Sequence, residues 1–523
     1  MWGARTLATF YVVNFESCDE SQHSKTLSRG IPTLVAAGLI LAFCFSAPAQ
    51  IQQAWVAKYN NGITNGNHQA LKVALDSSGS IYVLGVSQNI NTNTGYVTIK
   101  YAPNGNPLWT ARYDSTNYPS AIPTGFALDS SNAVAVTGNA VTVKYDSNGN
   151  QLWIVPDNAQ ALAVDSGQNI YLTGVSGNFT TMKLSPIGSN LWTTTWVYKG
   201  LPNLSQAIAV DSSSNVCVAG KETYPLYPYN VVNVGLLKYD SNGNMLWAEN
   251  PGSEGPFGDA QVVGLMPNGS GGVWLEANFG AHGEGTSQPY STLNFNSNGS
   301  LGSSAGDPTD DVFSWAHSLT LDNLGNVIVT GENAYYYPNN CYGTYKLDTN
   351  GNYLWTNLYP SVVIGNSVGT SITVDQGNNV YVTGYSPGVN SNSDIVTLKY
   401  DSNGNQVWLQ RYHGPGNGND AGNAIAVDNA SNVYVAGYET ETNGSTEMVL
   451  IKYSPVTLQK QPNGSVILHA YGAPGESFDL QASTNLQTWE DLGDVIADTN
   501  GVAQFDDTNA PLFNCRFYYT VPQ

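Results

Sequence analysis

The stretch KYDSNGNQVW at residues 399–408 decides the fold, because related copies of it recur along most of the chain. Each copy alternates apolar and polar residues, passes through a tight turn that tolerates positive φ, and ends on a second strand with a large aromatic side chain. This pattern predicts a β-hairpin. The copies end at Trp109, Trp153, Trp192, Trp247, Trp355 and Trp408.

A second phrase precedes each hairpin, and examples are AIAVDSSSNVCVAG at 207–220 and ITVDQGNNVYVTG at 372–384. It reads as a strand ending in an aspartate, a short polar turn, and a strand ending in glycine. The two phrases give four strands per unit and eight units, the fifth of which is degenerate around Pro267. Antiparallel units with a period of roughly 40 to 55 residues are typical of β-propeller blades. The strand-ending aspartates are Asp76, Asp129, Asp165, Asp211, Asp322, Asp375 and Asp428.

The ends of the repeat array predict how the ring closes. AWVAKY at 54–59 is a fourth strand without a first three, whereas the last unit, 423–453, has three strands and no closing tryptophan. We expect one to complete the other, which would leave no open sheet edge at either end of the array. The fold class is therefore all-β, an eight-bladed propeller closed by its N-terminal strand. A seven-bladed ring with an insertion is the alternative, because the fifth unit departs from the pattern.

The phrases AIAVD, NVYVTG and KYDSNGNQVW resemble the SBBP-type repeats of secreted and cell-surface bacterial β-propellers, over about residues 50–457. That resemblance implies the propeller fold. It implies no particular reaction, because the family is not tied to one.

The amino-acid composition limits the classes of partner that the protein is expected to bind. The chain has 523 residues, a formal net charge of −21 and charged residues at 11%. An acidic, sparsely charged surface disfavours nucleic acid and anionic membranes, since both require clustered Lys and Arg. We expect the protein to be a monomer. We also expect no membrane span, because no stretch after the leader is apolar and long enough to cross a bilayer.

Residues 1–49 read as a secretory signal peptide. An apolar run at 31–45 follows Lys25 and Arg29, and Ala47-Pro48-Ala49 is a small-residue cleavage pattern. The segment before Lys25 is long for a leader, so the true translation start could lie downstream of Met1. The expected location is outside the cell or on its outer surface.

The periodicity stops after Tyr453. A linker is predicted at 458–463, followed by a small β domain at 464–523 with a modest apolar core. Its phrases SFDLQASTNLQTWEDLG and FNCRFYYTV resemble a module that ends secreted proteins of the Verrucomicrobia type. By that resemblance it would be an accessory or surface-association domain.

Strand connectivity predicts two unlike faces. The turns between strands one and two and between three and four lie on one face and are short, whereas the loops between strands two and three and the crossovers between blades lie on the other and vary in length. Binding is expected on the variable loops. Tyrosines there could form flat platforms for a sugar or a protein, and packing of loops against each other is their alternative role. They are Tyr224, Tyr227, Tyr229, Tyr335, Tyr336, Tyr337 and Tyr342.

No residue earns a catalytic assignment, and no metal or cofactor is expected. Glu222, Glu332 and Glu439 follow similar strand ends and could serve a glycoside hydrolase or lyase, although solvated surface acids are the commoner explanation. Turn sets such as Asp146, Asn148 and Asn150 resemble the start of a calcium loop but lack its distal Glu, so they are expected to hold their own backbone. After the predicted leader, the histidines are scattered singly, at His68, His282, His317, His413 and His469.

These observations predict a secreted or cell-surface propeller that binds a glycan or a protein. They favour a binding protein over an enzyme. The alternatives are a carbohydrate-active enzyme that uses the loop acids, and a structural protein that displays other parts.

Overall fold

The computed structural model describes residues 11–14, 51–63, 65–197, 203–226, 229–250, 257–281, 290–306, 315–336, 339–360, 365–388, 392–471, 475–484, 488–498, 502–513 and 515–522. The chain divides into two compact units. One comprises residues 56–451, and the other comprises residues 1–55 together with 452–523.

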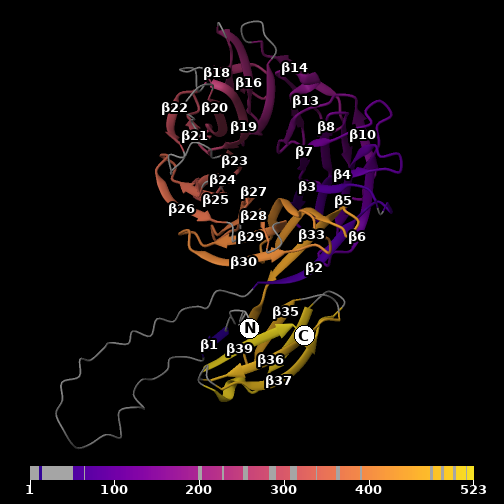
Figure 1. Ribbon diagram of the computed structural model, residues 1–523. Coiled ribbons are helices and arrows are strands. Elements are labelled where there is room, and N and C mark those ends of the chain that lie inside the picture. Colours follow the sequence, from indigo (N-terminus) through magenta and orange to yellow (C-terminus); the bar gives the residue numbers. More distant parts are fainter. Residues whose placement is uncertain are drawn as a thin grey trace, which may run out of the picture. The chain divides into compact units, whose positions relative to one another are not determined.

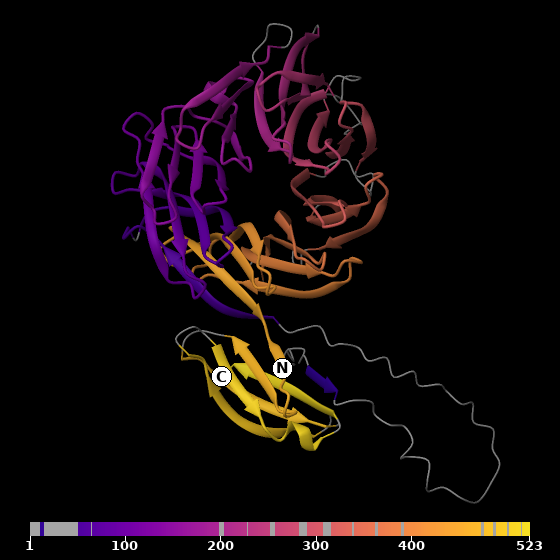
Figure 2. The same ribbon diagram turned by 180° about the vertical axis from the view of Figure 1, so that it is seen from behind.

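Eight four-stranded antiparallel sheets follow one another around a ring (Figure 1), as the repeat count predicts. Figure 2 shows the same succession from behind. Blade one contains β3 (His68–Leu75), β4 (Ile81–Gln88), β5 (Thr94–Tyr101) and β6 (Pro107–Tyr113), and blade two contains β7 (Pro123–Leu128), β8 (Val134–Gly138), β9 (Thr142–Tyr145) and β10 (Gln151–Val155). Blade three contains β11 (Ala161–Val164), β12 (Ile170–Thr173), β13 (Thr180–Leu184) and β14 (Asn190–Thr195), and blade four contains β15 (Leu204–Val210), β16 (Val216–Leu226), β17 (Tyr229–Tyr239) and β18 (Met245–Glu249).

The degenerate fifth unit is a complete blade, which excludes the seven-bladed alternative for this structure. Blades five to seven contain β19 (Phe257–Pro267), β20 (Val273–Ala281), β21 (Tyr290–Phe295) and β22 (Leu301–Ala305); β23 (Trp315–Leu321), β24 (Val327–Tyr336), β25 (Asn339–Leu347) and β26 (Tyr353–Tyr359); and β27 (Val368–Val374), β28 (Val380–Pro387), β29 (Ser393–Tyr400) and β30 (Gln406–Tyr412).

The eighth blade joins strands from opposite ends of the array. Its strand order is β2-β33-β32-β31, so the N-terminal strand β2 (Ile51–Tyr59) is the fourth strand beside β31 (Ala421–Val427), β32 (Val433–Thr440) and β33 (Thr446–Pro455). Blades one and eight also meet through their inner strands, where Asn423 Nδ2 donates to the carbonyl of Ala70 over 2.8 Å. The strand predicted to complete the last blade therefore lies in its sheet.

The hairpin phrase forms a bulged turn that holds neighbouring blades together. In the fourth blade, Gly243 adopts φ +86°, and a Cβ built on it would lie 2.8 Å from the Trp192 ring of the third blade. The Trp192 indole N–H donates to the Ser241 carbonyl of the same turn over 3.1 Å. The same indole-to-carbonyl contact recurs for Trp109, Trp153, Trp247 and Trp355. The turn glycine thus makes room for the preceding blade's tryptophan.

The strand-ending aspartates hold the other turn of each blade. Asp322 Oδ1 accepts the backbone N–H groups of Leu324 and Asn326, and Asp322 Oδ2 lies 2.7 Å from Lys346 Nζ on the third strand. Both side chains are almost fully buried. Equivalent Asp–Lys pairs occur in five further blades, so the aspartate and the lysine of the two sequence phrases form one recurring ion pair.

We expect Gly243→Ala to lower the free energy of unfolding by about 1–3 kcal/mol, because it combines a left-handed φ with a collision against Trp192. Gly269→Ala is the matched control, since Gly269 also has positive φ (+77°) but a Cβ added to it would meet no atom within 4 Å. Denaturant unfolding of both variants measures the difference. Equal losses would mean that the contact with tryptophan contributes nothing beyond backbone strain.

The second unit carries two small sheets. One has the order β1-β39-β36-β37 and the other β34-β35-β38. Their buried core includes Leu468, Phe478, Leu480 and Tyr518. The strands are β1 (Tyr11–Asn14), β34 (Thr457–Lys460), β35 (Val466–Tyr471), β36 (Ser477–Ser483), β37 (Glu490–Ile496), β38 (Val502–Asp507) and β39 (Cys515–Pro522).

Two strands of this unit fall in segments that the sequence predicts to be a linker and a leader. β34 occupies Thr457–Lys460 and pairs with β35, so most of the predicted linker at 458–463 is a strand and its following turn. Tyr11–Asn14, inside the predicted leader, form β1 and pair with β39. Among the described residues, no helix has the length and apolar character needed to span a membrane.

Candidate functional site

The loop face of the ring, which carries the crossovers and the loops between second and third strands, gathers ionisable side chains at blades seven and eight. The crossover 413–420 connects β30 to β31, and the hairpin 441–445 connects β32 to β33. The crossover follows the hairpin closely because its glycines allow it: a Cβ on Gly416 would meet the Thr440 carbonyl oxygen at 2.3 Å. Gly416 N–H donates to that oxygen over 3.0 Å. The glycine run thus serves packing.

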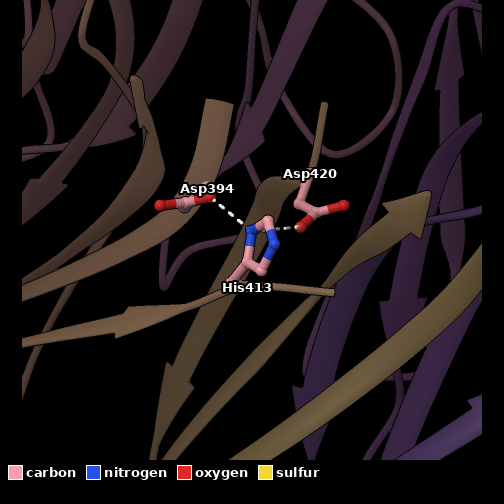
Figure 3. A group of neighbouring side chains, drawn as sticks. All are labelled: Asp394, His413 and Asp420. Atoms are coloured by element: carbon pink, nitrogen blue, oxygen red, sulfur yellow. Dashed lines mark hydrogen bonds and ion pairs between the residues drawn. The ribbon is translucent and has the colours of Figure 1, made fainter. Parts of the chain in front are cut away.

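Asp394, His413 and Asp420 form the first group, shown in Figure 3. His413 Nδ1 lies 2.8 Å from Asp394 Oδ1 and 3.9 Å from Asp420 Oδ2. Arg411 Nη1 donates to the other oxygen of Asp394 over 2.9 Å. The His413 side chain is 46% exposed, whereas both carboxylates are buried. A half-open imidazole therefore lies between two carboxylates.

Backbone groups fix Asp420 in place. Its Oδ2 accepts the Gly414 N–H and its Oδ1 accepts the Thr440 N–H, each over 2.7 Å. Burial raises the pKa of the Asp420 carboxyl above its ordinary value, against the opposing effect of these two N–H groups and of His413. Desolvation disfavours the charged form, so this carboxylate lies where extra positive charge would be favourable.

Glu439, Glu441 and Glu447 form a second group around Lys58 of β2. Lys58 Nζ pairs with Glu439 and lies 3.7 Å from Glu441 Oε1. Burial and a hydrogen bond with Glu441 raise the pKa of Glu447 to about 7. Burial lowers the pKa of Lys58, but its pairing with the glutamates outweighs that effect and leaves the pKa raised. This second group therefore carries its own cation.

Two hollows flank the hairpin 441–445. One, of about 210 Å³, is lined by Asn60, Ile63 and residues between Glu441 and Glu447. The other, of about 280 Å³, lies between the hairpin and the crossover and is lined by residues 415–418 and by Thr442. The loop face is thus hollowed on both sides of one exposed hairpin, with polar side chains at both sites.

A larger hollow, of about 540 Å³, lies on the opposite, turn-bearing face between blades four and five. It forms where Pro267 and the glycine-rich turn that follows replace the usual aspartate turn. Its charged groups already satisfy one another, because Lys238 Nζ donates to Asp211 Oδ2 over 3.0 Å and to the Gly271 carbonyl over 2.5 Å. It therefore offers a ligand little unpaired charge.

The predicted tyrosine platforms are described only in part. Tyr224 and Tyr229 lie at the tips of β16 and β17, and Tyr335 and Tyr336 at the tip of β24, but their side chains fall outside the described part of the structure. Tyr227 and Tyr337 lie outside it altogether.

The prediction for Tyr342 is wrong. Its ring is fully buried, its hydroxyl donates to the Val396 carbonyl of the next blade over 3.2 Å, and it packs edge-on against Tyr359. The alternation of side chains along β25 turns Tyr342 inward, between blades six and seven. It therefore packs the blades together, which is the alternative role stated for these tyrosines.

The three candidate acids do not meet at one site. Glu222 is buried in the fourth blade and accepts the Trp196 indole N–H over 2.8 Å, and Glu439 is buried beside Lys58 in the eighth. Glu332 is partly exposed and accepts an N–H of Asn340 over 2.7 Å. Burial raises the pKa of Glu332, but bonds from His317 and Asn340 outweigh this and lower it. Each acid has a local structural partner.

The turn aspartates act as predicted. Asp146 Oδ1 accepts the backbone N–H groups of Asn148 and Asn150, and Asp146 Oδ2 accepts the Asn150 side chain. The same set recurs at Asp240, Asp348 and Asp401. These carboxylates hold their own turns.

The group around His413 is the feature that sequence reasoning missed. The histidine is isolated in the sequence, because Asp394 lies in the preceding hairpin and Asp420 at the far end of the crossover. The available signal was a histidine and an aspartate bounding a glycine-rich crossover, HGPGNGND at 413–420.

Glu276 is a fully buried acid on β20 of the fifth blade, in which Pro267 replaces the recurring strand-ending aspartate. The Thr292 hydroxyl donates to its Oε2 over 2.5 Å. Burial raises the pKa of Glu276 to about 8, against the opposing effect of this hydrogen bond. The folded protein therefore favours the protonated acid at neutral pH.

Because the folded pKa of Glu276 lies above the unfolded value, its contribution to stability is fully present below about pH 4.5 and is lost as the pH rises through about 8. We expect Glu276→Gln to remove this loss, so that the variant gains in melting temperature relative to the parent between pH 6 and pH 9. Thermal unfolding across that range measures the difference. Glu249→Gln, at an exposed position, is the control and should follow the parent.

No family model matches the chain. An uncharacterized WD repeat-containing protein, L264, of Acanthamoeba polyphaga mimivirus is 24% identical over an alignment of 188 residues, and the match covers 31% of this chain and 13% of that protein's length.

Solved structures with partial similarity include a eukaryotic initiation factor (9% identity, TM-score 0.40, 84% of this chain and 98% of that chain). They also include a protein of unknown function from Bacteroides caccae (14% identity, TM-score 0.33, 53% of this chain and 91% of that chain). A third is the calcium-binding protein regucalcin from Agrobacterium tumefaciens (14% identity, TM-score 0.31, 57% of this chain and 91% of that chain).

Proposed function

We propose that this protein is a secreted or cell-surface binding propeller of the SBBP-like type, which holds a glycan or a protein on its loop face without chemically changing it. The observation that carries this proposal is the difference between the two faces. The turn face uses its carboxylates to hold its own turns. The loop face gathers acids, a histidine and two hollows around one exposed hairpin.

A rigid ring with unlike faces suits recognition, because the sheets fix the positions of loops that are free to differ. Glu441 and Thr442 line both hollows at the hairpin, and these polar side chains fit hydroxyl-rich or peptide ligands better than apolar small molecules. By strand connectivity, the ends of β16 and β24 that carry Tyr224 and Tyr335 belong to the same face, and these tyrosines would extend the contact surface.

The test is a glycan-array screen of the full chain, with product analysis of every polysaccharide that binds and an affinity pull-down of cell-surface proteins in parallel. We expect saturable binding with no cleavage. Thr442→Trp should weaken it, because Thr442 is exposed and lines both loop-face hollows. Asn403→Trp places the same bulk on an exposed turn of the other face and should leave binding intact. Cleavage products, or equal effects of both substitutions, would contradict the proposal.

Secretion is a separate element of the proposal. We expect N-terminal sequencing of exported protein to begin after Ala49, which would remove β1 from its sheet. Recovery of the intact chain from the cytoplasm, with none outside, would contradict it.

A further inference from the structure

The side chains of Asp394, His413 and Asp420 converge from three segments of blades seven and eight (Figure 3). Asp394 lies near the start of β29, His413 directly follows β30, and Asp420 directly precedes β31. One oxygen of each carboxylate and a nitrogen of the imidazole all lie within 4.8 Å of one another. Such convergence from separate segments gives the group a fixed geometry that a flexible loop would lack.

Charge at the group is incompletely balanced. Asp420 has no exposed surface, and a second fully buried carboxylate, that of Glu439, lies near it. Arg411 pairs with Asp394, and Lys58 pairs with Glu439. Among the residues that the structure describes, neither a lysine nor an arginine pairs with Asp420, and the nearest group of this set is His413 Nδ1, 3.9 Å from Asp420 Oδ2. A buried carboxylate is costly unless a cation or a metal ion accompanies it.

We propose that Asp394, His413 and Asp420 bind one divalent transition-metal ion of the Zn²⁺ type. An ion about 2.1 Å from each ligand in tetrahedral geometry holds pairs of ligand atoms roughly 3.4 Å apart. The present separations from His413 Nδ1, 2.8 Å to Asp394 and 3.9 Å to Asp420, lie on either side of that value. Small side-chain rotations would therefore bring the three atoms to an ion.

The donor set selects the class of metal. One imidazole nitrogen with two carboxylate oxygens suits Zn²⁺ and related ions, whereas Ca²⁺ requires six to eight oxygen ligands. Outer partners orient the carboxylates, as metal sites require: Arg411 holds Asp394, and the N–H groups of Gly414 and Thr440 hold Asp420. The 46% exposure of His413 leaves a side open on which water or a ligand oxygen could complete the coordination.

The competing explanation is a metal-free group, in which contacts with His413 and with backbone N–H groups hold the two carboxylates without an ion. Isothermal titration of the untagged, chelator-treated full chain with Zn²⁺, Mn²⁺ and Ca²⁺ separates the two. We expect one equivalent of Zn²⁺ to bind and to raise the melting temperature, with Mn²⁺ weaker. His413→Gln should reduce Zn²⁺ affinity by about tenfold or more. This variant should still fold, because the side chain is half exposed.

His317→Gln is the matched control. His317 Nε2 lies 3.9 Å from Glu332 Oε1 and its side chain is 39% exposed, so it presents a single His–carboxylate pair. Zn²⁺ affinity should not change in this variant. Asp420→Asn tests the carboxylate and should weaken Zn²⁺ as His413→Gln does.

Three results would overturn the proposal. The first is no saturable binding of Zn²⁺ to the parent protein. The second is equal Zn²⁺ affinity in the parent and in His413→Gln. The third is Ca²⁺ binding that depends on Asp420 but not on His413. The metal site does not depend on the proposed glycan or protein ligand, because the readout is the ion alone.

Discussion

Asp322→Ala is expected to lower the free energy of unfolding by about 3–5 kcal/mol, because it leaves the buried Lys346 ammonium without its partner. The lysine side chain is 3% exposed and that of the aspartate is fully buried. The change also removes the acceptor of two turn N–H groups, from Leu324 and Asn326. Guanidinium unfolding at pH 7 measures the loss.

Asp348→Ala is the control within the same blade. Asp348 accepts the N–H groups of Asn350 and Asn352 in the same pattern but near the surface, so its replacement should cost about 0.5–2 kcal/mol. The double variant Asp322→Ala with Lys346→Met should recover much of the loss, because it removes both charges together. A loss for Asp322→Ala no greater than that for Asp348→Ala would show that the ion pair is unimportant.

Trp192→Ala is expected to cost about 3 kcal/mol, at the lower end of the range for tryptophan truncation because the ring is half-buried. Its indole lies between Tyr171 of its own blade and Tyr239 of the next, with ring centroids 6.0 and 6.4 Å away. It also donates to the Ser241 carbonyl of that next blade. The substitution therefore removes a contact that joins two sheets.

Leu191→Ala is the matched control for this variant. Leu191 precedes the tryptophan on β14, at the bulge of the hairpin, and is 54% exposed. Its truncation should change the free energy of unfolding by less than about 0.5 kcal/mol. Comparable losses at the two positions would contradict the role of Trp192 as the link between blades three and four.

The repeat phrases predicted the blade architecture correctly because their constraints are local. Within the phrases, the tight turn requires a positive φ, which glycine adopts without strain. The aspartate accepts the N–H groups of residues two and four positions later. The alternation of side chains places the tryptophan on one side of its strand. The fifth unit was ambiguous from letters alone, since Pro267 replaces the aspartate there, yet β19 to β22 form a full sheet.

The candidate site could not be predicted from the repeat phrases. The sequence suggested that Glu222 and Glu439 are loop acids, but they lie within β16 and β32 and are buried. Tyr342 faces the neighbouring blade instead of solvent. Conversely, His413 looked isolated and is not. Exposure and proximity across blades depend on register and twist, which are absent from any one repeat.

The sequence by itself determined the strand count, the turn chemistry and the return of the N-terminal strand to the last blade, because each follows from residues close together in the chain or from the periodicity of the array. The tertiary structure alone decided which side chains meet. Asp394, His413 and Asp420 come together because a glycine-rich crossover packs against the neighbouring hairpin. Asp420 is buried there and accepts the N–H groups of Gly414 and Thr440. That burial, and the charge that it leaves to be balanced, arises only when two blades pack together.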